Sequence, residues 1–247
     1  MAKRPETKTA AASNNLRTSP LVIGGLVVIA VLVVLVLIQS GGRTTAASAP
    51  TFAAAGVETG LTAAGYPYRG SLQAKVVMVE YEDLRCPYCR QYFVDTEPQV
   101  QEQFVRAGLV REESHVVAFL GAASHAAAEA AACASDQNKF WEFRHEAFAN
   151  QKAESEALGR EDFGQWAAAI GLDLTKFNNC FDTAKHSAWV DQTTAEAQRR
   201  GVSATPSFFV NDNLYQGAFP FTAEGGQPNF KNILETALAA AGGTPAP

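Results

Sequence analysis

A C-P-Y-C motif at residues 86–89 stands between two segments of different periodicity, and this junction constrains the local fold. The segment 75–81 before the motif is an apolar, β-branched run of strand length. The segment 90–107 after it carries apolar residues at roughly helical spacing. Pro87 suits the first helical position, where its missing N–H costs nothing, and Cys86 then falls at the N-cap. The sequence therefore predicts a strand, a short loop and a helix that begins at the motif.

This placement has a chemical consequence for Cys86. The free N–H groups of the first helical turn, those of Tyr88 and Cys89, can point at the Cys86 sulfur. The positive end of the helix dipole favours a thiolate over a thiol, and cysteines so placed have pKa values of roughly 3.5–7.5 instead of about 8.5. A stable thiolate is both a nucleophile and a good leaving group, so the pair is a candidate redox centre.

Two other interpretations of the cysteine pair stay open at the level of the residues. A zinc site needs four ligands, usually two such pairs or one pair with histidines. The chain has no second C-x-x-C and no H-x3-5-H pair, so we expect no metal. A purely structural disulfide at a helix start would be exposed and easily reduced.

A second motif, Thr205-Pro206, precedes the apolar run 207–210. The turn cluster 211–213 and the run 214–218 complete the pattern of a β-hairpin whose first strand opens with proline. In this order the two motifs resemble the thioredoxin superfamily, most closely the DsbA-like thiol–disulfide oxidoreductases. The resemblance covers about residues 70–240 and is carried by 79–81 leading to the cysteines, 126–134, 139–141 and 205–220.

The resemblance implies an α/β thioredoxin fold over residues 57–241, with a helical subdomain inserted at about 122–200. The inserted stretch is alanine-rich, and its pattern indicates helices at 122–135, 138–150, 162–170, 174–181 and 185–200. Residues 242–247 are expected to be a disordered tail.

Site residues follow from the same resemblance. Cys86 attacks, and Cys89 is the buried resolving cysteine, with Pro87 and Tyr88 between them in the active-site loop. Pro206 is cis and packs beside the pair, which leaves the backbone of Thr205 to pair with an extended substrate segment. The alternative is an ordinary trans proline at an edge strand.

Glu80 lies on the strand before the motif, where DsbA-like proteins often carry an acid. The functional interpretation is a partly buried carboxylate, its pKa raised by burial, that moves protons to or from Cys89. The alternative is an alternating strand that shows Glu80 and Glu82 to water.

Two further cysteines, Cys133 and Cys180, lie in the predicted insertion. With the motif cysteines paired locally, these two would form a structural disulfide, as some DsbA-like proteins have. Such a bridge would stabilise the fold by about 4 kcal/mol in the chain-entropy model. Two buried free cysteines that pack as small hydrophobes are the alternative.

Residues 21–38 form an apolar run without a charge, just long enough to span a bilayer. Positive residues precede it at Lys3, Arg4, Lys8 and Arg17, and only Arg43 closely follows it. The pattern predicts a single-pass anchor in the cytoplasmic membrane, with residues 1–20 in the cytoplasm, a flexible tether at 39–56 and an exported domain. A cleaved signal peptide with a small-residue site at 47–49 is the alternative.

These features together predict a membrane-anchored oxidoreductase that puts disulfides into exported proteins with free cysteines. The resemblance implies reoxidation by a membrane quinone-linked protein, a monomer, and no flavin, nucleotide or metal cofactor. The net charge of −5 and the absence of basic patches give no sign of nucleic-acid binding.

Two alternative functions remain. A disulfide isomerase or reductase can use the same fold, and Thr205 before Pro206 is frequent in isomerase-type members. A non-catalytic chaperone would bind peptides in the groove beside Pro206.

Overall fold

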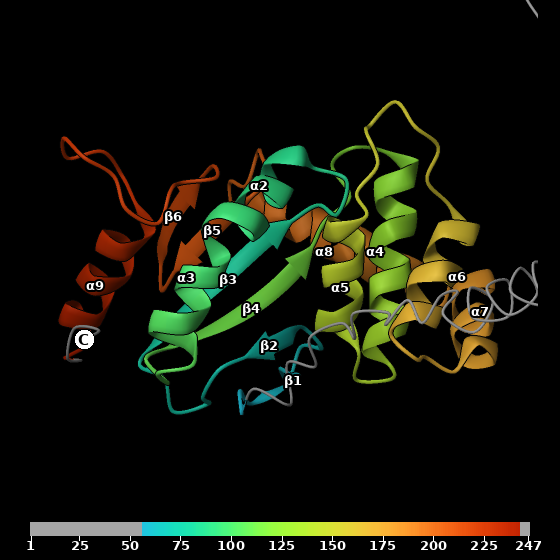
Figure 1. Cartoon of the computed structure of the whole chain (residues 1–247), viewed down its shortest axis with the longest axis horizontal. Coiled ribbons are helices and arrows are strands. Elements are labelled where there is room, and N and C mark those ends of the chain that lie inside the picture. The colour runs from blue at the N-terminus through green and yellow to red at the C-terminus, as the bar shows by residue number, and fades with distance from the viewer. Residues whose placement is uncertain (1–55, 243–247) are drawn as a thin grey trace, which may run out of the picture. The chain divides into compact units, whose positions relative to one another are not determined.

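A six-stranded mixed sheet forms the centre of the protein in this computed structural model, which describes residues 56–242 (Figure 1). The strands lie in the order β1 (Thr59–Leu61), β2 (Pro67–Arg69), β4 (Val110–Val116), β3 (Val76–Glu82), β5 (Ser207–Val210) and β6 (Asn213–Gln216). β3 and β4 are parallel, and every other neighbouring pair is antiparallel. The chain therefore leaves β3 in the middle of the sheet, and the cysteine motif begins there.

The helices are α2 (Pro87–Asp95), α3 (Glu97–Val100), the π-helical turn η2 (Gln101–Val105), α4 (Ala122–Ser135), α5 (Phe140–Ala149), α6 (Arg160–Ala169), α7 (Leu174–Asp182), α8 (Ser187–Arg199) and α9 (Phe230–Ala240). Helices α4 to α7 gather at one end of the sheet, on the right in Figure 1, and α9 lies at the other end. The thioredoxin-like α/β fold with its added helices agrees with the expectation, and the inserted helices start and end within two residues of the predicted bounds.

The single helix predicted over 90–107 is wrong, because the structure breaks it at Thr96. Thr96 leaves helical geometry with φ −119°, and Pro98 follows in the first turn of α3. A proline has no N–H to continue the hydrogen-bond ladder, and its ring crowds the preceding turn. After η2 the chain turns at Gly108, whose φ of +71° favours glycine.

The two faces of β3 pack against different helices. Val76 and Met78 join a core with Phe208, α2, η2 and α9. Tyr81, on the opposite face, packs with Phe209 and α8. Since successive strand residues alternate between faces, the neighbours Phe208 and Phe209 serve opposite sides of the sheet. Strand β5 of the hairpin that the sequence predicted is thus part of the core, whereas β6 is only partly buried.

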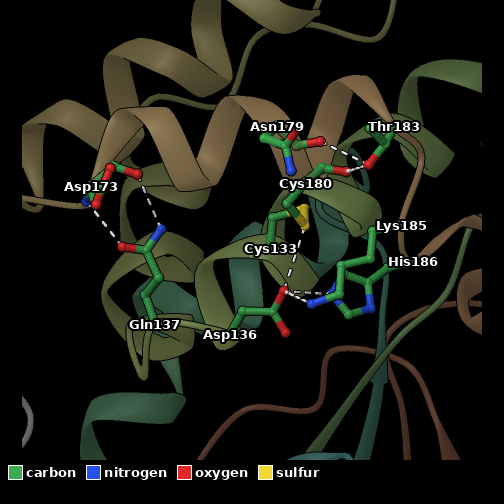
Figure 2. Close-up of a disulfide and its surroundings, with 9 residues drawn as sticks. All are labelled: Cys133, Asp136, Gln137, Asp173, Asn179, Cys180, Thr183, Lys185 and His186. Atoms are coloured by element: carbon green, nitrogen blue, oxygen red, sulfur yellow. Dashed lines mark hydrogen bonds and ion pairs between the residues drawn. A yellow bond between two sulfur atoms is a disulfide. The ribbon is translucent and has the colours of Figure 1, made fainter.

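Cys133 of α4 and Cys180 of α7 are joined in a disulfide that ties the insertion to itself (Figure 2). Beside it the Asp136 carboxylate accepts hydrogen bonds from Lys185 Nζ at 2.7 Å and from His186 Nε2 at 3.0 Å. The pairing of Cys133 with Cys180 is the one expected from the sequence, and the alternative of two free cysteines does not hold.

Between residues 56 and 242, none of the helices combines the length and the apolar character that crossing a membrane needs. The predicted anchor at 21–38, the tether as far as residue 55 and the tail beyond residue 242 lie outside the described residues.

Candidate active site

The cysteine motif occupies the start of α2, directly after the central strand. Cys86 is the N-cap, with extended backbone angles of φ −73° and ψ 121°, and Pro87 is the first helical residue. Cys86 is 6% exposed and Cys89 is fully buried, while Tyr88 between them is 63% exposed. Both cysteines are free thiols in this structure, and only the first reaches the surface.

The surroundings of Cys86 favour its thiolate. A hydrogen bond from the Cys89 thiol is the main cause that lowers the pKa of Cys86, to about 6, although burial opposes it. The Thr205 side chain and the backbone N–H groups of Cys89 and Tyr88 lower the pKa further. The helix-start donors were expected from the sequence, whereas the leading contribution, that of the Cys89 thiol, was not.

The pKa of Cys89 is shifted in the opposite direction to that of Cys86. Burial raises the pKa of Cys89 well above its usual value, and the hydrogen bond that it donates to Cys86 adds to the shift. The backbone N–H of Asp83 contacts the Cys89 sulfur at 3.5 Å and lowers the pKa, but does not outweigh the burial. At neutral pH the pair therefore holds its negative charge on the accessible sulfur and its proton on the buried one.

The Thr205-Pro206 segment lies against Cys86. The peptide bond between Thr205 and Pro206 is cis. The Cys86 thiol donates to the carbonyl oxygen of Thr205 across 3.2 Å. Strand β5 begins at the next residue, and Ser207 pairs with Tyr81 of β3, so sheet register brings the two motifs together.

Glu80 does not face water, so the exposed-strand alternative is wrong. Both Glu80 and Glu82 are fully buried. Arg144 of α5 donates to both carboxylate oxygens of Glu82, at 2.7 and 2.8 Å, and to one oxygen of Glu80 at 3.0 Å. Burial and the charge of Glu82 raise the pKa of Glu80 well above its usual value, against the attraction of Arg144.

The carboxylate whose charge raises the pKa of Cys89 is that of Glu82. Glu80 lies in the same buried ionic cluster as Glu82, on the same face of the sheet. We keep the proton role of Glu80 as a hypothesis, and add Glu82 as a second carboxyl group that acts on the buried sulfur.

The buried cluster continues from Arg144 along the same face of the sheet to β2. Arg69 of β2 pairs with Glu97 at 2.6 Å and with Glu112 at 2.9 Å, and Arg144 also pairs with Glu97 at 2.7 Å. With Glu80 and Glu82, the cluster thus sets four carboxyl groups against two guanidinium groups. Burial first, and then this excess of negative charge, raise the pKa of Glu80 well above its usual value, and burial also raises the pKa of Glu82.

Sequence reasoning missed most of this cluster. Charged residues inside an apolar strand, such as Glu80 and Glu82, were a usable signal because buried charges need partners. Arg144 stands among the aromatic residues of α5, which was a second signal. Which glutamate meets which arginine follows only from the packing of α5 on β3.

Asp83 fastens the active-site loop to the insertion. Its buried carboxylate accepts backbone N–H groups of Phe119 at 2.9 Å and Leu120 at 3.1 Å. It also accepts the N–H of Arg85 at 2.9 Å and the hydroxyl of Ser124 at the start of α4. The loop that carries Cys86 is therefore hydrogen-bonded to the segment 119–124, where the helical insertion begins.

The chain is similar to known proteins in sequence and in structure. A family model described as thioredoxin matches residues 62–224. The probable disulfide bond formation protein D of Bacillus cereus is 31% identical over 150 residues, which cover 59% of this chain and 69% of that protein. The crystal structure of oxidised BdbD from Bacillus subtilis superposes with a TM-score of 0.64 and 26% identity, covering 76% of this chain and 99% of that one.

A third similarity is partial. The Na(+)/H(+) antiporter NhaA 3 of Salinispora tropica is 33% identical over 157 residues, or 63% of this chain. The match spans only 23% of the length of that antiporter.

Proposed function

The chain belongs to the thioredoxin family, and from this premise we propose that it is a membrane-anchored, extracytoplasmic thiol–disulfide oxidoreductase that oxidises exported proteins. The observation that carries the proposal is the unequal pair, in which an accessible Cys86 has a lowered pKa and a buried Cys89 has a raised one. The name of the Bacillus cereus relative, a disulfide bond formation protein, supports the same reaction class.

The proposed reaction starts from the oxidised pair. A client thiolate attacks the Cys86 sulfur, the bond between Cys86 and Cys89 breaks, and Cys89 leaves and takes up a proton. A second client thiolate then attacks the client sulfur of this mixed disulfide, and Cys86 leaves as a thiolate. The client loses two electrons and two protons; the pair gains both electrons and one proton, and the other proton goes to solvent. The low pKa of Cys86 favours its departure in the last step.

The proposal includes a location and a partner. Residues 21–38 would anchor the domain, and the positive residues before them would keep the amino terminus inside. The reduced pair must pass two electrons on, and we propose a membrane quinone-linked protein as the acceptor. Immunoblots of membrane and soluble fractions test the anchor, which a shortened protein in the soluble fraction would contradict.

The reduction potential of the Cys86–Cys89 pair tests the direction of the reaction. A disulfide oxidase requires a reduction potential well above about −270 mV, the value for thioredoxin. We expect such a potential for this pair because the helix start stabilises its reduced form. A glutathione titration measures it, and a value near that of thioredoxin would favour a reductase or isomerase. Cys89→Ala should trap clients on Cys86, whereas unchanged function of Cys86→Ser in cells would favour a non-catalytic chaperone.

A further inference from the structure

A groove of about 570 Å³ opens directly beside the cysteine motif, between the start of α2 and the loop 151–155 that follows α5. Pro87 and Arg90 of α2 form one wall. Gln151 of the other wall donates to the carbonyl oxygen of Cys86 at 3.1 Å. This hydrogen bond links the groove wall directly to the backbone of Cys86. A polypeptide bound at Cys86 would therefore lie next to this groove.

Arg85 lines the groove as a buried cation without an anion. It is only 4% exposed, and its Nη2 donates to three backbone carbonyl groups, those of Ala153, Glu154 and Glu156, at 2.7–3.2 Å. Its Nη1 is buried and has no hydrogen-bond partner. Among residues 56–242 no carboxylate pairs with Arg85, although buried charges are costly unless they are paired.

Arg90 adds a second uncompensated charge, and this one is exposed. Its Nε donates to the carbonyl oxygen of Phe148 at 3.0 Å, and within the described part of the chain it forms no ion pair. Lys152 also lines the groove but is neutralised by Asp162 at 2.5 Å. Glu154 is the acidic residue of the lining. The groove thus carries an excess of positive charge in a protein whose net charge is −5.

We propose that this groove receives an aspartate or glutamate side chain of the client polypeptide, a few residues from the cysteine that reacts at Cys86. A carboxylate fits a guanidinium group in charge and in hydrogen-bond geometry. The groove then makes the enzyme selective for cysteines with acidic neighbours. This selectivity rests on the proposed function, since it needs a client at Cys86.

Synthetic peptides test the selectivity. One set carries two cysteines with a glutamate at each of the three positions on either side of the first cysteine, and a matched set carries glutamine there. The rate constant for oxidation by the oxidised protein should be about two- to fivefold higher for the best glutamate peptide than for its glutamine partner. The ratio should fall toward one at high salt, which screens exposed charges.

Three variants assign the effect to the groove. Arg90→Gln should remove most of the preference, and Arg90→Lys should retain it because the charge stays. Glu154→Gln should increase the preference, since it removes the opposing charge. Arg106→Gln removes another exposed charge, outside the groove lining, and should leave the ratio unchanged.

A binding measurement separates this inference from the proposed function. Peptides with serine in place of cysteine cannot react, and their fluorescence polarisation with the protein reports the glutamate-to-glutamine affinity ratio directly. Oxidation of both sets at equal rates, with equal affinities, would overturn the inference and leave the oxidoreductase intact. Failure to oxidise either set would refute the function, and the affinity ratio would still decide whether the groove binds acidic side chains.

Discussion

The Cys86 sulfur donates a hydrogen bond to the carbonyl oxygen of Thr205 at 3.2 Å, although 119 positions separate the two residues in the chain. A carbonyl oxygen can only accept, so this bond belongs to the thiol form of Cys86. The Thr205 side chain lowers the pKa of Cys86 and thus favours the thiolate form. Thr205 of the cis-proline segment therefore acts on Cys86 through both its carbonyl oxygen and its side chain.

Replacement of Cys89 should shift the titration of Cys86. The Cys89 thiol makes the largest contribution to the lowered pKa of Cys86, so Cys89→Ala should move that pKa from about 6 toward the ordinary value of about 8.5. Cys89→Ser keeps a hydroxyl donor and should move it less. The pH dependence of the alkylation rate measures both, and equal midpoints in the two variants would contradict the assignment.

The contribution of Cys86 to the stability of the reduced protein should rise with pH between about 6 and about 8.5. The folded pKa of Cys86 lies below its unfolded value, so the stabilisation is fully present above the unfolded pKa and is lost as the pH falls through about 6. The difference from Cys86→Ser should grow across this window by on the order of 2–3 kcal/mol. Urea unfolding of both reduced proteins measures it; parallel pH profiles would rule it out.

Removal of Arg144 should destabilise the fold strongly. Arg144→Met leaves Glu82, Glu80 and Glu97 without a shared cation in the interior, and breaking a buried ion pair in this way costs about 3–5 kcal/mol. Arg160→Met removes an exposed pair with Asp182 and should cost far less, because solvent screens exposed ion pairs. Similar free energies of unfolding for the two variants would show that the cluster is not critical.

Loss of the second disulfide should also lower stability. The bridge between Cys133 and Cys180 spans 47 positions, and the chain-entropy model gives about 4 kcal/mol for a loop of this size. The double variant Cys133→Ala/Cys180→Ala should lose this much in urea unfolding under non-reducing conditions. Alkylation after mild reduction should add two labels to the wild type, and four labels without reductant would mean that the bridge does not form.

The local elements near the site were predictable because their causes are local. Pro87 at a helix start, the β-branched run of β3 and the turn cluster before β6 each act over a few residues. The break at Thr96 was equally local, since Pro98 stands in the sequence. The ionic cluster was not, because the partners of Glu80 and Glu82 come from α5 and β4.

The sequence by itself determined that Cys86 begins a helix after a strand, and the resemblance of its two motifs identified the fold. Only the tertiary structure decided the charges at the site. The pKa of a thiol or carboxyl group depends on burial and on neighbours within a few ångströms, and these neighbours come from distant segments. Thr205 at Cys86, the charge of Glu82 acting on Cys89, and Arg85 among the carbonyl groups of residues 153–156 are such consequences of packing.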